Sequence, residues 1–86
     1  MNTFQEHALF NAIERAWDAI QREQWHNAEG KANQAIGTVN ALWWDGAIEQ
    51  DAWSELRAIF TNWAIQSWFQ QRGFGTLTYD GANTHV

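Results

Sequence analysis

The sequence predicts an all-α fold, a three-helix bundle with an extended C-terminal arm. The chain contains no proline, so no residue is barred from a helix interior by its ring. Apolar residues recur at steps of three and four through most of the chain, which is the period of one helix face. Turn chemistry is concentrated at Asp45-Gly46 and at Gly73 and Gly75, and it divides the chain into helical stretches.

The first helix is expected at about residues 3–24. Thr3, followed three residues later by Glu6, has the pattern of a capping box, in which each side chain bonds the backbone amide of the other residue. The apolar residues that follow at helical spacing are expected to form the core face of this helix. They are Leu9, Phe10, Ile13, Ala16, Trp17 and Ile20.

The second helix is expected at about residues 27–44, after a turn near 24–27. Two continuous apolar stripes on a single long rod would both be exposed, so an antiparallel hairpin is preferred. Gly30 and Gly37 each cost a helix about 1 kcal/mol relative to Ala. The small residues of the second stripe allow a neighbouring helix to approach closely. This stripe is formed by Trp25, Ala28, Ala32, Ala35, Ile36, Val39, Leu42 and Trp43.

The third helix is expected at about residues 49–72. Glu49, Asp51 and Glu55 lie near its start, where the positive end of the helix dipole favours carboxylates. Glycines 73 and 75 end it. Residues 1–75 are thus predicted to form the helical bundle, and residues 76–86 a partly mobile arm. The expected core face of the third helix is Leu56, Ile59, Phe60 and Trp63.

Aromatic side chains are abundant for so short a chain, with seven Trp and five Phe. On the third helix, Ile65, Trp68 and Phe69 point away from the expected core face. Either the arm folds back over them through Phe74, Leu77 and Tyr79, or another protein chain covers them. Trp44 lies at the edge of the second helix, where it either caps the bundle or joins this surface. The candidate protein-interface residues are therefore Trp44, Ile65, Trp68 and Phe69.

The charge balance argues against several classes of partner. Ten acidic and five basic residues give a net charge of −5, so a phosphate backbone would be repelled and no direct nucleic-acid contact is expected. The longest uncharged run, residues 58–71, falls short of the roughly 20 residues that span a bilayer, so no membrane partner is expected. The absence of cysteine excludes a disulfide or a thiolate nucleophile and is compatible with the cytoplasm, where we expect the protein to be.

No catalytic, cofactor-binding or metal-ligating residues are predicted. Glu23 and His26 have the Glu-x-x-His spacing of di-iron bundles, but such sites need two copies of the motif and two further glutamates. Glu14 and Asp18 lie one turn apart beside Arg22, as on an ordinary solvated helix face. No cofactor and no small-molecule substrate are therefore expected.

The sequence favours a non-enzymatic protein that binds another protein, or a second copy of itself as a homodimer, through its aromatic surface. In its small size, acidity and lack of cysteine it resembles, in type rather than in any motif, the inhibitors and regulators that phages and plasmids carry against host proteins, such as inhibitors of CRISPR effectors. One alternative is a transcription-related regulator with a helix-turn-helix-like or DNA-mimicking surface. Another is a structural subunit of a larger assembly.

Overall fold

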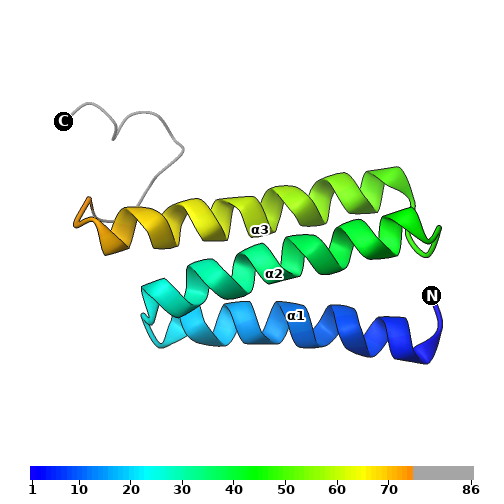
Figure 1. Ribbon diagram of the computed structural model, residues 1–86, viewed down its shortest axis with the longest axis horizontal. Helices are drawn as coiled ribbons and strands as arrows, with labels where there is room; N and C mark the ends of the chain where they lie inside the picture. The colour runs from blue at the N-terminus through cyan, green and yellow to red at the C-terminus, as the bar shows by residue number, and fades with distance from the viewer. Residues whose placement is uncertain (75–86) are drawn as a thin grey trace.

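A computed structural model describes residues 1–74 of the chain. Within this range the fold consists of three α-helices and no strand: α1 (Thr3–Gln21), α2 (Trp25–Trp44) and α3 (Gln50–Gln71) (Figure 1). The predicted all-helical class is therefore confirmed for this part of the chain. The predicted arm, residues 76–86, lies outside the described residues.

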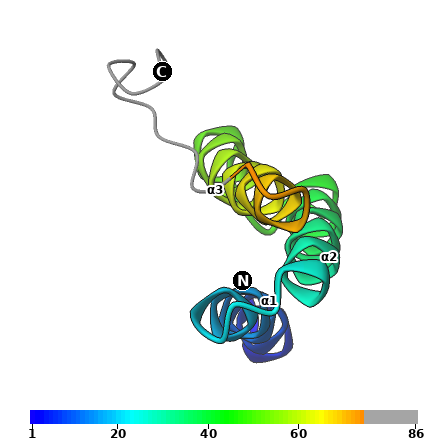
Figure 2. The same ribbon diagram turned by 90° about the vertical axis from the view of Figure 1, so that its left-hand side faces the viewer.

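Helix α2 occupies the centre of the arrangement. It packs along both other helices, whereas α1 and α3 come close to each other at very few points. Seen along the helices, α2 stands at a corner and α1 and α3 extend from it in two directions (Figure 2). Because the chain reverses at each short connection, α1 and α3 run parallel to each other and antiparallel to α2 (Figure 1).

The seam between α1 and α2 is built from alanine. Methyl side chains let two helix backbones approach to the short end of the usual 8–10 Å range. Such a seam has little room for an aromatic ring, although α1 also buries one larger side chain, Leu9. The buried alanines of the two helices are Ala16 and Ala19 on α1 and Ala28, Ala32 and Ala35 on α2.

The larger core residues gather between the second half of α2, the first half of α3 and Leu9 of α1. Phe60 is the only Trp or Phe side chain of the chain that is buried. Beside this core, the Trp43 and Trp53 rings stack with centroids 4.6 Å apart, and the Trp53 indole Nε1 donates to Asn40 Oδ1 at 2.8 Å. These contacts fasten the start of α3 to the end of α2.

All three helices end in the same way, with a residue in the left-handed region. Gly46 and Gly73 both have φ 76°, and Glu23 has φ 57°. After α1, for example, the amide of Gln24 donates to the carbonyl of Ala19 at 2.9 Å, which is the long hydrogen bond of a Schellman motif. Glycine adopts this conformation without strain, but a residue with a Cβ does not. Glu23 therefore carries backbone strain that the two glycines avoid.

The N-terminal cap of α1 lies one residue earlier than predicted. Asn2, not Thr3, is the N-cap: its Oδ1 accepts from the Gln5 amide at 2.8 Å, and the Gln5 side chain accepts from the Asn2 amide at 3.0 Å. Asparagine is among the best N-cap residues, and a Gln at the third helical position completes a capping box as well as Glu does. The expected pairing of Thr3 with Glu6 was wrong for this reason.

Three residues expected in the core are exposed. Phe10, Trp17 and Ile59 keep 58%, 47% and 44% of their surface accessible. The sequence predicts each of them in the core because each recurs at three- and four-residue steps with other apolar residues of its helix. In the structure α1 meets α2 through its alanines, and α3 does not close against α1, so the flank of each helix that carries these side chains stays open.

Replacing Glu23 by glycine should stabilise the protein. The substitution relieves a left-handed conformation that costs a residue with a Cβ about 1–2 kcal/mol, so the free energy of unfolding should rise by about 1 kcal/mol. Urea denaturation followed by circular dichroism measures this. Gln34→Gly, in the exposed interior of α2, is the matched control and should lower stability by roughly 0.5–1 kcal/mol. Equal destabilisation by both substitutions would contradict the strain at Glu23.

Phe60 should carry far more of the stability than any exposed Phe. Phe60→Ala is expected to cost about 3–4 kcal/mol, since it removes a buried ring and leaves a cavity. Phe4 lies exposed on α1, so Phe4→Ala should change stability by less than about 0.5 kcal/mol. Denaturation midpoints of the two variants check this, and similar losses would show that the core is elsewhere.

Candidate protein-binding surfaces

A groove of about 330 Å³ lies between the start of α2 and the end of α3. These two segments are neighbours because the helices are antiparallel. The α3 wall is apolar, and the α2 wall contributes a carboxylate and an amide. We call this the α3 groove, and its lining residues are Glu29, Asn33, Ala64, Ile65, Trp68 and Phe69. The fold thus brings together three of the four residues proposed from sequence as an interface.

An aromatic cluster closes the end of the α3 groove. The Trp68 ring lies 5.5 Å from Phe69 and 6.1 Å from Phe74, centroid to centroid, and the Arg72 guanidinium carbon lies 3.9 Å from the centre of the Trp68 ring. Trp68 and Phe69 are half-buried as a result. Ile65, which is 38% exposed, is the more accessible member of the groove. Phe74 covers part of this surface, whereas Leu77 and Tyr79 lie outside the described residues.

Gln71 fixes the polar edge of the groove. Its Nε2 donates to Glu29 Oε1 at 2.7 Å and to the Trp25 carbonyl at 3.2 Å, and its Oε1 lies 3.3 Å from His26 Nδ1. One side chain of α3 therefore links three residues in the first turns of α2. This network holds the two walls of the groove at a fixed separation. It also shows that His26 contacts the end of α3.

Trp44 lies at the other end of the molecule and is not part of the groove. It is 83% exposed, and it contacts the edge of Trp43, which stacks on Trp53 at the start of α3. Trp53 and Trp68 are about 22 Å apart along α3, at about 1.5 Å per residue. At that exposure Trp44 does not cap the bundle either. The four candidate residues therefore form one surface of three and one separate side chain.

A second apolar surface, which the sequence reasoning missed, spans α1 and α3. The Trp17 and Trp63 rings meet across the two helices with centroids 5.5 Å apart. The evenly spaced alanines of α1 and α2 were the available signal, because a seam of small residues leaves the bulky stripe beside it unused. We call this surface the α1/α3 face. It consists of the exposed Phe10, Trp17 and Ile59 and the half-buried Ile13, Leu56 and Trp63.

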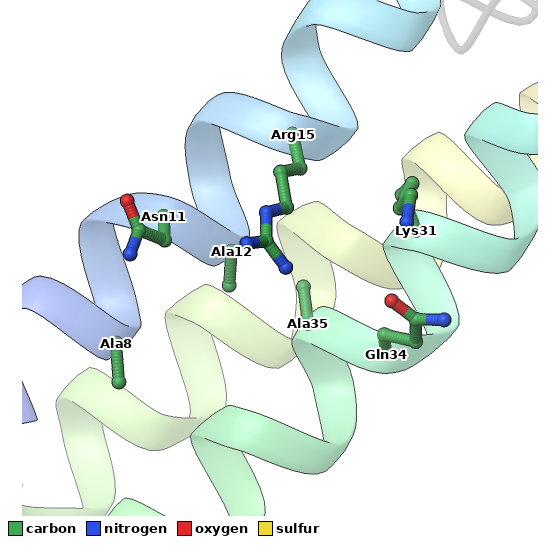
Figure 3. Close-up of a pocket in the computed structure, with 7 residues that line it drawn as sticks. All are labelled: Ala8, Asn11, Ala12, Arg15, Lys31, Gln34 and Ala35. Atoms are coloured by element: carbon green, nitrogen blue, oxygen red, sulfur yellow. The ribbon is translucent and has the colours of Figure 1, made fainter.

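A separate hollow, of about 220 Å³, lies between α1 and α2 on the other side of α1. Figure 3 shows Arg15 from α1 and Lys31 from α2 at this hollow, together with the amides of Asn11 and Gln34. It has no carboxylate, hydroxyl or imidazole in its lining. Two cations are few for a phosphate backbone, whose binding normally rests on many such contacts.

The described residues offer neither a metal site nor a membrane-spanning helix. Within residues 1–74 no group of His, Cys, Asp and Glu is placed to hold a metal ion. No helix of this range is both long enough and apolar enough to cross a bilayer. No family model matches the chain, and neither a curated protein nor a solved structure matches it. The chemistry of its own surfaces is therefore the basis for proposing a function.

The half-buried Trp68 and the exposed Trp44 should differ sharply in their contribution to stability. Trp68→Ala removes a half-buried ring with three ring or cation contacts and should cost about 2 kcal/mol. Trp44→Ala removes a ring that lies almost wholly in solvent and should cost less than about 0.5 kcal/mol. Urea denaturation of both variants measures the difference. Equal costs would contradict the separation of Trp44 from the aromatic cluster.

Proposed function

We propose that this chain is a non-enzymatic protein that acts by binding another protein through the α3 groove. The observation that carries the proposal is the convergence of Ile65, Trp68 and Phe69 on one groove with an apolar wall. Tryptophan and other large aromatics are enriched among the residues that dominate binding energy at protein interfaces. A rigid groove of this kind suits an apolar anchor from a partner.

The polar edge of the groove supports the same function. Glu29 stands opposite the apolar wall and is held there by Gln71. A fixed carboxylate at the rim gives a partner one directional contact beside its apolar anchor, and such contacts set orientation more than affinity. Because the walls are fastened in advance, little ordering is required on binding.

The biological setting that we propose is regulation of a host protein in the cytoplasm, as by the small inhibitors that phages and plasmids carry. Its support is the character of this surface: an acidic helical unit with net charge −5 and large apolar side chains exposed on it. A homodimer through the same groove is the version of the proposal in which the partner is a second copy.

The transcription-related alternative receives less support from the helix arrangement. The helices of a helix-turn-helix meet at a steep angle, roughly 90–120°. Here α2 and α3 lie alongside each other, antiparallel, over most of their length (Figure 1). A structural role in a larger assembly would use the same apolar surfaces and stays an alternative.

Binding through the α3 groove should be lost in the variant Ile65→Asp. Ile65 is exposed, so a carboxylate there should spare the fold while placing charge in the apolar wall. The matched control is Ala58→Asp, an exposed site two turns earlier on α3. Affinity purification with quantitative mass spectrometry identifies the partners that each variant retains. Sedimentation gives the mass of the free protein and so reports self-association. Unchanged partners and unchanged mass for Ile65→Asp would refute the proposal.

A further inference from the structure

The three helices are placed like three corners of a four-helix bundle. In an up-and-down bundle each helix contacts two neighbours, and the helices on a diagonal are parallel and farther apart. Helix α2 has the two neighbours, and α1 and α3 are parallel and barely touch (Figure 2). The contact between Trp17 and Trp63 bridges the diagonal. The fourth corner is the position in contact with the α1/α3 face.

The α1/α3 face has the dimensions and the chemistry that a fourth helix requires. The contact of Trp17 with Trp63 sets the alignment of the two parallel helices, and it places Phe10 level with Leu56, seven residues earlier on each. The apolar surface therefore runs for about two turns along both helices, roughly 10 Å at 1.5 Å per residue. Helices that lie in apolar grooves are anchored by side chains at matching helical intervals.

Acidic side chains border this face on both helices. On α1, Glu6 and Glu14 lie one turn before and one turn after Phe10, and on α3, Glu55 lies one turn before Ile59. Residues one turn apart are neighbours on a helix surface. Within residues 1–74 none of these three glutamates forms an ion pair; the pair that does form joins Asp18 and Arg22. Glu14 and Asp18 also line a hollow of about 300 Å³ beside Trp17.

Four of the five basic side chains lie away from this face. Arg15 and Lys31 line the hollow on the opposite side of α1 (Figure 3). Arg57 and Arg72 stack on Trp53 and Trp68, on the flank of α3 that adjoins the α3 groove. Arg22 pairs with Asp18. The rim of the α1/α3 face therefore has an excess of negative charge: its one cation, Arg22, is already paired with Asp18, whereas Glu6, Glu14 and Glu55 form no ion pair in the described residues.

We propose that the α1/α3 face binds an amphipathic helix of another protein, in which an apolar stripe is flanked by Lys or Arg. The helix would occupy the fourth corner, antiparallel to α1 and α3. The acidic rim selects a basic partner, since complementary charge steers association and like charge opposes it. A second copy of this chain would bring the same glutamates to the same rim and a net charge of −5, so it is disfavoured.

The test uses the full chain and a synthetic 18-residue helical peptide of leucine and lysine, with leucine on one face. Calorimetry at low salt should show binding, with an affinity that falls roughly tenfold or more as screening rises toward 0.5 M salt. A matched peptide with glutamate for lysine should bind at least about tenfold more weakly. Equal binding of the two peptides would overturn the proposal.

The position of the bound peptide is tested with variants of exposed residues, which should keep the helical content of the protein. Phe10→Gln and Ile59→Gln should each weaken binding of the lysine peptide by about tenfold. Ile65→Gln and Trp44→Gln, which alter the other exposed apolar sites, should leave it within about twofold. If the Phe10 and Ile59 variants bind like the wild type, the peptide lies elsewhere and the proposal is wrong.

Two other occupants of the face would also overturn the proposal. Sedimentation showing a dimer that Phe10→Gln converts to a monomer would identify a second copy. Nuclear Overhauser contacts from Leu77 or Tyr79 to Phe10 or Ile59 in the full chain would identify its own C-terminal segment. Since Ile65 is absent from the α1/α3 face, failure here leaves the proposal for the α3 groove untouched, and the reverse also holds.

Discussion

The alanine seam between α1 and α2 is the constraint on which the rest of the structure depends. Buried methyl groups on both helices bring the two backbones together and leave little volume between them for an aromatic ring. Burial of aromatic rings must then occur against α3. That interface accommodates one of them completely, Phe60, and stacks Trp43 and Trp53 at its edge. Other aromatic side chains lie on the flanks of the helices, outside this interface. Several of them line the two candidate binding surfaces, the α3 groove and the α1/α3 face.

Helix α3 shows the consequence most clearly. Between Arg57 and Arg72 it has no charged residue, because three different parts of its circumference are apolar. One stripe, centred on Phe60, packs on α2. The flank with Ile59 and Trp63 belongs to the α1/α3 face, and the opposite flank with Trp68 belongs to the α3 groove. A helix that serves a core and two surfaces cannot show a single amphipathic stripe.

The sequence was sufficient for the fold class and for most of what depends on local chemistry. The helical period, the Asp45-Gly46 turn and Gly73 placed three helices within a few residues of their observed ends. It was also sufficient for the grouping of Ile65, Trp68 and Phe69, since residues one turn apart share a flank whatever the helix packs against. Both inferences depend only on neighbours along the chain.

What the sequence could not supply was the angle at which α1 and α3 meet around α2. Phe10, Trp17 and Ile59 have the same spacing whether α3 closes against α1 or stands away from it, so they were assigned to the core. The grouping of Trp44 with Ile65, Trp68 and Phe69 overlooks the antiparallel order of the helices, in which a short connection puts the end of α2 beside the start of α3 and away from its end. The exposure of Phe10, Trp17 and Ile59 is instead set by tertiary placement, which overrides local pattern.

The solvent exposure of the large apolar side chains can be measured directly. Solvent paramagnetic relaxation enhancement is recorded on the side chains of the full chain at low concentration. The structure predicts strong enhancement at Phe10, Ile59 and Trp44 and almost none at Phe60, with an Overhauser contact between Trp17 and Trp63. Uniform protection of all these side chains in a monomer would contradict it.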